Sequence, residues 1–340
     1  MPEKEKIIII TNEKIFLGKG MCCCDNIDIK TIIEGLSKKF DVTTYCRPSI
    51  NKRLVSFDVK KIFQVNNIFS FVKSVFAILK KKDKKILYIS IHPFSFCFFI
   101  FVSLLRKNSY VYLRSDGFKE YNVILGKKWI WIYKIMFDIF TFSSKIISCH
   151  SSLAKGKQQQ MINPSELDRD WLLDIKEIKT DVPKLLYVGR LKIEKGIFSL
   201  ISIIKSISIK INLTIVGSGE NILKEDLNFV KLTPYLNSKN KLINCYDESN
   251  IVILPSFTEA HPKVVDESLA RLRPVIIFNE IKHIIQDRKG IFVADRNPGS
   301  LKDMIFYILN NYKTIQQSMK ENKLPTKENF LRDLGKIIEN

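Results

Sequence analysis

Two short segments of the chain combine cations, glycines and carboxylates at spacings that could hold an anion. The first runs from Gly189 to Gly196 and holds Arg190 and Lys195, five residues apart, between an apolar strand and a helix. In α/β sheets, a strand end that opens onto a helix N-terminus binds anions, because free backbone N–H groups and the helix dipole point there. A guanidinium matches phosphate oxygens with a planar fork, and an ammonium adds a point charge. The alternative is that both are ordinary surface cations.

The second segment follows another apolar strand and carries Glu259 and Glu267 on either side of a predicted helix start at Pro262. Eight residues span roughly 12 Å at helical rise, which is the scale of a nucleotide-sugar from its hexose to its ribose. One carboxylate could accept hydrogen bonds from sugar hydroxyls and the other from ribose hydroxyls, while N–H groups near Lys263 and Val264 meet the pyrophosphate. By itself, this spacing also arises by chance in many helices.

A glycine turn lies between the two segments, and all three form one set of motifs. The set is Gly189-Arg190-Leu191 with Glu194-Lys195-Gly196, then Gly217-Ser218-Gly219, then Pro255-Ser256 and Glu259 with seven residues before Glu267. This set resembles the C-terminal domain of a family 4 glycosyltransferase of the GT-B fold. The resemblance extends over residues 184–295, about a third of the chain.

This resemblance implies an α/β protein with two Rossmann-like parallel-sheet domains that face a central cleft. It implies a nucleotide-sugar donor held mainly by the second domain, transfer with retention of anomeric configuration, and no cofactor or essential metal ion. In that family the residues matching Arg190 and Lys195 bind the donor diphosphate, the one matching Glu259 contacts the sugar and the one matching Glu267 contacts the ribose. Gly217 matches a turn near the nucleobase. The rest of the expected donor-binding set is Gly20, Gly189, Pro262, Lys263 and Val264.

The first half of the chain resembles the family less closely. Gly20 lies in a glycine-bearing loop after the opening strand, where the family approaches the donor phosphates and where glycine permits close backbone approach. Asp116 follows a strand where many relatives place a histidine facing the sugar, so it could contact acceptor or sugar, or simply form an Asp-Gly turn. His92 stands before Pro93 at another strand end, where it could face the cleft or serve the helix entry.

Apolar strands that alternate with helical segments predict parallel sheets built from crossover units. The expected strands are 7–10, 41–45, 62–65, 86–91, 111–113 and 146–148 in the first half, and 184–188, 212–216, 251–254, 274–277 and 291–293 in the second. The polar stretch 158–182 shows no clear sheet period, which favours a domain boundary there. We predict domains at 1–170 and 171–324, with a final amphipathic helix at 325–340 that joins the first.

The chain of 340 residues carries a formal net charge of +20, which calls for an anionic partner. Residues 1–180 hold 31 basic and 17 acidic side chains, against 24 and 18 in residues 181–340, so most of the excess lies outside the donor motifs. We read it as attraction to an anionic membrane surface or to a pyrophosphate-linked acceptor. No interleaved aromatic and basic module supports a nucleic-acid-binding protein, which is the alternative from another class.

The cysteines and one long apolar segment bear on three further classes of protein: disulfide-rich, zinc-binding and membrane-spanning. Seven cysteines, three of them consecutive at Cys22, Cys23 and Cys24, suit neither a disulfide framework nor a zinc site and indicate a reduced cytoplasmic protein. Residues 86–105 have the length of a membrane span, but His92-Pro93 divides them into a predicted strand and a buried helix.

The sequence therefore predicts a retaining glycosyltransferase that acts on a glycan or lipid-linked acceptor in bacterial surface polysaccharide or lipopolysaccharide assembly. We expect it in the cytoplasm, with a peripheral contact at the inner face of the cytoplasmic membrane. Two enzyme alternatives remain open, a nucleotide-sugar epimerase and a phosphorylase of the same fold.

Overall fold

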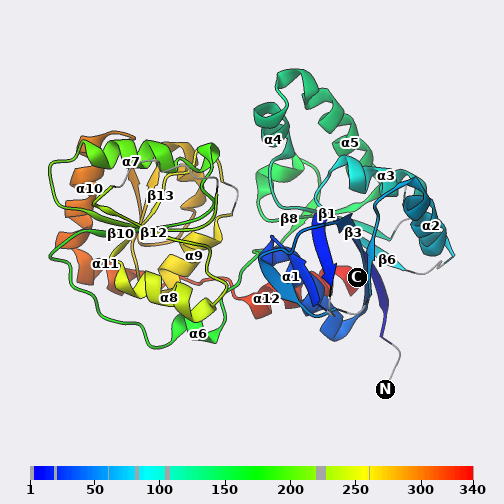
Figure 1. Cartoon of the computed structure of the whole chain (residues 1–340), viewed down its shortest axis with the longest axis horizontal. Coiled ribbons are helices and arrows are strands. Elements are labelled where there is room, and N and C mark those ends of the chain that lie inside the picture. The colour runs from blue at the N-terminus through cyan, green and yellow to red at the C-terminus, as the bar shows by residue number, and fades with distance from the viewer. Residues whose placement is uncertain are drawn as a thin grey trace. The chain divides into compact units, whose positions relative to one another are not determined.

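The computed structural model describes residues 4–18, 21–59, 61–80, 84–103, 108–219, 227–259 and 261–339. The chain divides into two compact units, each built on its own sheet (Figure 1). The first unit is Met1–Pro164 with Glu328–Asn340, and the second is Ser165–Lys327. The predicted boundaries, at 170/171 and 324/325, lie a few residues from those that the structure shows. The final helix rejoins the first unit.

The sheet of the first unit is parallel around its centre, where β1 lies between β3 and β6. The order continues as β6-β7-β8-β9 on one side and β3-β5 on the other, while the end of β1 pairs antiparallel with β2, and β2 with β4. The strands are β1 (Lys6–Gly18), β2 (Met21–Cys24), β3 (Asp41–Pro48), β4 (Val55–Phe57), β5 (Ile62–Gln64), β6 (Lys85–Ile89), β7 (Ser109–Leu113), β8 (Lys145–Ser148) and β9 (Gln159–Met161).

Helices cover this sheet, and α2, α3 and α5 pack on one another in sequence. The helices are α1 (Ile27–Lys39), α2 (Ile68–Leu79), α3 (Pro93–Val102), α4 (Gly117–Ile124), α5 (Ile130–Ser143) and α12 (Lys327–Glu339), with 3-10 turns η1 (Lys127–Trp129) and η2 (Ser151–Ala154). The predicted final helix is confirmed as α12, which buries Phe330, Leu334 and Ile338.

In the second unit, the strands that the structure describes form a parallel sheet in the order β12-β11-β10-β13-β14-β15. They are β10 (Lys184–Val188), β11 (Asn212–Val216), β12 (Val230–Thr233), β13 (Ile251–Leu254), β14 (Val275–Phe278) and β15 (Ile291–Ala294). From β10 the chain first adds strands on one side and then returns to add β13 on the other. The switch point of the sheet therefore lies between β10 and β13, where open α/β sheets bind ligands beyond the carboxyl ends of their strands.

The helices of the second unit bury an aliphatic core against both faces of its sheet. They are α6 (Arg169–Leu172), α7 (Ile197–Lys205), α8 (Lys239–Glu248), α9 (Lys263–Ala270), α10 (Pro298–Asn310) and α11 (Tyr312–Met319), with η3 (Ile193–Lys195) and η4 (Asn279–Ile284). Every residue of β13 and β14 is buried, which is why these segments read as continuous apolar runs. The prediction of two parallel-sheet α/β domains is confirmed.

Three details differ from the prediction. The stretch 158–182 contains a strand, β9, and the short helix α6, whose polar sequence gave no periodic signal. The strands β2, β4 and β12 were also not expected. Helix α3 is not wholly buried, because one face holds Phe101 at 61% exposure. Within the residues described, no helix is both long and apolar enough to span a membrane.

Candidate functional site

The loop that follows β10 is held against the loop that follows β11. The Leu191 N–H donates to the Ser218 carbonyl at 3.0 Å, and Leu191 also forms an isolated parallel bridge with Gly219. A Cβ on Gly217 would lie 1.9 Å from the Gly189 carbonyl oxygen, closer than any side chain can approach. Gly217 therefore has a packing role at this strand end, whatever else it binds.

The loop that follows β13 lies beside the first loop, as the strand order requires. The Phe257 N–H donates to the Glu194 carbonyl at 3.1 Å. Gly196 has a φ of 69°, and a Cβ there would stand 1.9 Å from the Pro255 carbonyl oxygen. Since both loops leave the carboxyl ends of neighbouring strands at the switch point, the two predicted motifs lie side by side.

Lys195 and Glu259 form the central contact of this site. The Lys195 Nζ donates to Glu259 Oε1 at 2.6 Å, and the Ser256 hydroxyl donates to the same oxygen at 2.7 Å. The two ionic side chains are 21% and 13% exposed, so they remain accessible. Arg190 lies five residues before Lys195 in the same loop and is exposed. The expected sugar ligand thus lies against one of the two expected diphosphate ligands, Lys195, which is already paired with the carboxylate.

Helix α9 carries the rest of the expected donor set. Pro262 is its N-cap residue, and Lys263 and Val264 form the first turn, whose N–H groups have no acceptor within the helix. The Lys263 Nζ donates to Glu166 Oε1 at 2.9 Å, and burial lowers the pKa of Lys263 to about 7.

Glu267 lies one turn further along α9 and points into the protein. Its Oε2 accepts a hydrogen bond from the Tyr246 hydroxyl at 2.7 Å. Burial is the main cause that raises the pKa of Glu267 above its ordinary value, although the Tyr246 hydrogen bond and the nearby Lys263 oppose the shift. A buried carboxylate with one donor in place has capacity for further donors, such as hydroxyl groups.

Arg296, which the sequence reasoning missed, supports the loop that bears Glu259. Its Nη2 donates to the Pro255 carbonyl at 3.1 Å, and its Nε donates to Glu280 Oε1 at 2.7 Å. The guanidinium lies 4.2 Å and 4.3 Å from the ring centroids of Phe257 and Phe278. The sequence could have indicated Arg296 by its position, because it follows the carboxyl end of β15 by two residues, as the other motifs follow the carboxyl ends of their strands.

A second missed group surrounds the start of α9. His261 Nε2 lies 3.0 Å from Asp266 Oδ2, and Arg288 donates to Asp266 Oδ1 at 2.6 Å. On the other side, His283 Nε2 lies 2.9 Å from the Glu259 carbonyl oxygen. One of these contacts holds the Glu259 carbonyl and the other holds the His261 side chain, and a sequence pattern shows neither.

The candidates of the first unit have helix-capping contacts. His92 is the N-cap of α3, where its Nδ1 accepts from the Phe94 N–H at 3.3 Å. Burial lowers the pKa of His92. Asp116 is the N-cap of α4, accepts from the Phe118 N–H at 3.1 Å and is paired with Lys155 at 3.0 Å. Gly20 lies outside the described residues. An acceptor or donor role for these three stays a prediction.

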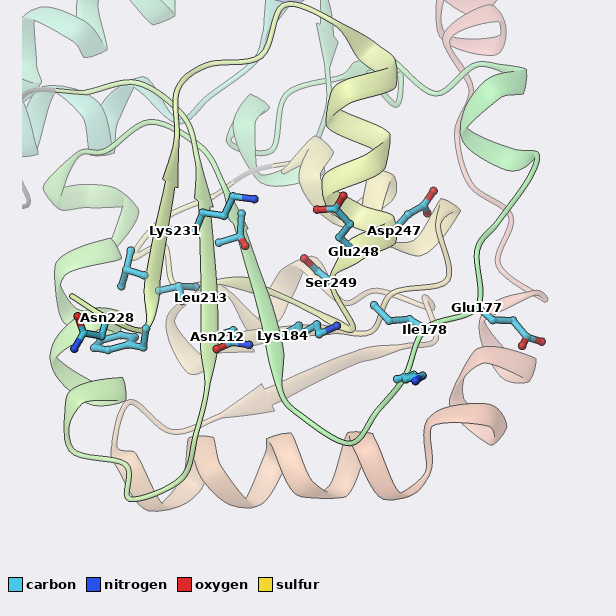
Figure 2. A pocket seen from close by; sticks show the side chains of 14 residues that line it. Glu177, Ile178, Lys184, Asn212, Leu213, Asn228, Lys231, Asp247, Glu248 and Ser249 are labelled. Atoms are coloured by element: carbon cyan, nitrogen blue, oxygen red, sulfur yellow. The ribbon is translucent and has the colours of Figure 1, made fainter. Parts of the chain in front are cut away.

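A pocket of about 640 Å³ lies at the amino ends of strands in the second sheet, and Figure 2 shows side chains that line it. Lys184, Asn212 and Val230, which begin β10, β11 and β12, line it together with residues of the segment 177–179 and the end of α8. None of the predicted site residues lines this pocket. It is therefore separate from the motifs at the carboxyl ends of the strands.

Comparison with known families places the motifs in a glycosyltransferase domain. Residues 168–324, almost the whole of the second unit, match the family model described as "Glycosyl transferases group 1". This match covers less than half of the chain and identifies the class of the second unit.

Two curated relatives match parts of the chain. An "Uncharacterized glycosyltransferase" of Haemophilus influenzae is 28% identical over 181 residues, 47% of this chain and 48% of the relative. An "Uncharacterized 41.2 kDa protein in cps region" of Klebsiella pneumoniae is 24% identical over 222 residues, 64% of this chain and 59% of the relative. The aligned parts thus span about half of each relative's length.

Solved structures match nearly the whole chain. Sucrose-phosphate synthase from Thermosynechococcus elongatus aligns with a TM-score of 0.71 and 15% identity, over 99% of this chain and 98% of that one. Anabaena Alr3699/HepE in complex with UDP and glucose aligns with a TM-score of 0.69 and 11% identity, over 98% and 99%. WaaG, a glycosyltransferase involved in lipopolysaccharide biosynthesis, also gives 0.69, at 15% identity and over 98% and 99%. These likenesses identify the fold as that of GT-B glycosyltransferases.

Proposed function

We propose that this protein is a retaining glycosyltransferase that moves a sugar from a nucleoside-diphosphate donor to a glycan or lipid-linked acceptor. The observation that carries the proposal is the contact between two loops at the switch point of the second sheet. One loop supplies Arg190 and Lys195, and the other supplies Glu259, which lies 2.6 Å from Lys195. An anion beside a carboxylate that can hold hydroxyl groups is the chemistry of a sugar diphosphate.

In the proposed mechanism the two cations act on the leaving group. Breaking the anomeric bond places additional negative charge on the diphosphate, so cations already in position stabilise the transition state more than the ground state. Lys195 can bind Glu259 and the diphosphate at the same time, because its ammonium has three N–H donors and only one of them is needed by Glu259. Ser256 keeps Glu259 in place while Lys195 turns to the phosphate.

Helix α9 contributes the remaining donor contacts in this proposal. The N–H groups of Lys263 and Val264 at its first turn meet the diphosphate, where the helix dipole adds to the attraction. Glu267, oriented by Tyr246, accepts hydrogen bonds from the ribose hydroxyls. Gly189 and Gly217 allow the nucleotide to approach the backbone, and Gly217 lies near the base.

The side-chain cations also bear on the question of a metal ion. No group of three or more His, Cys, Asp or Glu side chains in the described parts of the chain could hold a metal ion. We propose that Arg190 and Lys195 neutralise the leaving diphosphate, so that transfer continues in the presence of a chelator. Turnover that stops in EDTA and returns with a divalent cation would contradict this.

The descriptions of relatives and similar structures suggest which donor and which acceptor to test. One relative comes from a cps region, a similar structure is WaaG of lipopolysaccharide biosynthesis, and another similar structure holds UDP and glucose. These descriptions support a uridine nucleotide as the first donor to test, and a role in bacterial surface polysaccharide or lipopolysaccharide assembly. The proposed location is the cytoplasm, at the inner face of the cytoplasmic membrane.

A thermal-shift screen of nucleoside-diphosphate sugars tests the donor assignment, because a ligand that binds only the folded state raises the melting temperature by mass action. The sugar nucleotide that raises the melting temperature most is then incubated with the protein and a glycan acceptor, and the product is analysed by proton NMR. We expect transfer with the anomeric configuration of the donor kept. Interconversion of the free sugar nucleotide without an acceptor would contradict the proposal in favour of an epimerase.

A further inference from the structure

A helical tip on the first unit exposes large apolar side chains. This tip, residues 121–135, joins α4 to α5 through η1, and Figure 1 shows α4 and α5 extending beyond the strands of their sheet. Five large apolar residues within it are exposed: Ile124 (75%), Leu125 (51%), Trp129 (49%), Trp131 (60%) and Ile135 (48%). Two of the three tryptophans of the chain are among them.

Helix α5 is apolar on two opposite faces, and only one of them meets the protein. Tyr133, Met136, Phe137 and Phe140 are buried. Trp131 and Ile135 follow one another at a spacing of four residues on the exposed side. Asp138, one turn after Ile135, is paired with Lys157 and bounds the apolar part of this side. Neighbouring exposed apolar side chains can mark a contact surface for a partner.

The charges of the tip indicate the chemistry of that partner. Lys127, Lys128 and Lys134 are exposed, and residues 121–135 contain no Asp or Glu. Nearby lysines outside the tip have acidic partners instead, since Lys155 is paired with Asp116 and Lys157 with Asp138. The partner must accept apolar side chains in its interior and cations at its rim.

We infer that this tip docks the protein on a bilayer that contains anionic lipids. Tryptophan favours the level of the lipid headgroups, apolar side chains next to it enter the acyl boundary, and lysines attract anionic headgroups. A second copy of the chain fits less well, because a two-fold contact would place these lysines against one another. The inference rests on the proposed function only in placing a lipid-linked acceptor at that membrane.

The tryptophans allow a direct test with the whole protein. Trp171, the third one, is buried at 2% exposure, so a change in emission on adding vesicles reports on Trp129 and Trp131. With vesicles of equal parts phosphatidylglycerol and phosphatidylcholine we expect a blue shift that weakens as salt is raised. An unchanged spectrum, or an equal shift with phosphatidylcholine alone, would overturn the inference.

Two sets of substitutions locate the contact. Trp129→Ser with Trp131→Ser should lower vesicle affinity by more than about tenfold, because it removes the largest apolar anchors. Each of Lys127→Gln, Lys128→Gln and Lys134→Gln should lower it by about fivefold. The matched control is Phe69→Ser with Phe76→Ser on α2, another exposed apolar face, at 83% and 60% exposure.

The control should bind vesicles as the unaltered protein does. A loss in the α2 variant as large as that in the tryptophan variant would overturn the assignment to the tip. Melting temperatures without lipid check that each variant is folded. The proposed donor contacts lie outside the tip and outside α2, so donor-induced thermal stabilisation should be unchanged in every variant, which separates failure of this inference from failure of the proposed function.

Discussion

The two units share one architecture, but their candidate residues are used differently. In the second unit the predicted residues touch each other across two loops, as Lys195 and Glu259 do at 2.6 Å. In the first unit the candidates His92 and Asp116 make contacts with the helix starts that follow them. The units therefore differ in what their candidates contact: in the second unit two predicted residues pair with each other, whereas in the first unit His92 and Asp116 each cap a helix and Asp116 also pairs with Lys155.

The largest effect is expected from Glu259→Ala. It removes the proposed sugar contact and the partner of Lys195, so turnover should fall by about 10²- to 10³-fold, the usual cost of losing a group that acts in the transition state. The assay is transfer from the donor found by thermal shift. Lys192→Ala is the matched control, because Lys192 is an exposed cation of the neighbouring loop, and it should keep near-normal turnover. Normal rates for Glu259→Ala would remove it from the site.

The glycines of the second unit test how tightly its loops are packed. Gly217→Ala places a Cβ 1.9 Å from the Gly189 carbonyl oxygen, so we expect a loss of about 1–3 kcal/mol in the free energy of unfolding. Gly299→Ala is the control, since the nearest atom to its Cβ would be 3.5 Å away. Urea denaturation compares the two. Equal stabilities would show that the loops are not packed as described.

Asp116 can act either as a helix cap or as an acceptor contact in the first unit. If its role is the N-cap of α4, Asp116→Ala should cost about 1 kcal/mol, and Asp116→Asn, which also caps, should recover most of it. Thermal denaturation measures both. Should transfer disappear in Asp116→Asn while stability is retained, Asp116 would be an acceptor contact and the contrast between the units would be weakened.

The smallest effect is a pH dependence of donor affinity. Burial raises the pKa of Glu267 above the ordinary 4.5, so as pH falls through that raised pKa the carboxylate is protonated and loses capacity to accept ribose hydroxyls. Affinity measured by calorimetry should therefore fall several-fold at the acidic end. Lys263, with a pKa of about 7, gains charge as pH falls and acts in the opposite direction. In Glu267→Gln the fall of donor affinity at acidic pH should disappear, while the gain of affinity that comes from protonation of Lys263 should remain.

Without donor, the contribution of Glu267 to the stability of the fold should depend on pH in the opposite sense from donor affinity. Its folded pKa is higher than its unfolded pKa, so the folded state binds the proton more tightly, and this contribution is present at low pH and lost as pH rises through the folded value. Comparing the protein with Glu267→Gln isolates this term. If the Glu267 carboxylate stabilised the fold more as pH rose, the direction of its pKa shift would be contradicted.

The strands of the second unit could be predicted because β10, β13 and β14 are buried on both faces and contain almost only apolar residues. The loops that follow them could be predicted because cations, glycines and carboxylates stand at fixed distances from those strands. The short strands β9 and β12 were not predicted: β9 shows neither alternation nor a continuous apolar run, and β12 alternates apolar and polar residues over four positions only.

Contacts that depend on long-range packing were also beyond the sequence. Arg296 reaches Pro255 across 41 residues, and Tyr246 reaches Glu267 from another helix. Lys84, which belongs to the lysine-rich run at 80–85, is only 8% exposed. Charge counted along a chain therefore does not locate a charged surface.

Calorimetry with UDP and the other nucleoside diphosphates measures whether the two loops of the second unit bind a donor diphosphate. We predict that the unaltered protein and Lys192→Ala bind one of them equally, while Arg190→Ala combined with Lys195→Ala weakens binding by at least about a hundredfold, as expected for two charge-assisted contacts. Equal affinity in the double variant would contradict the account.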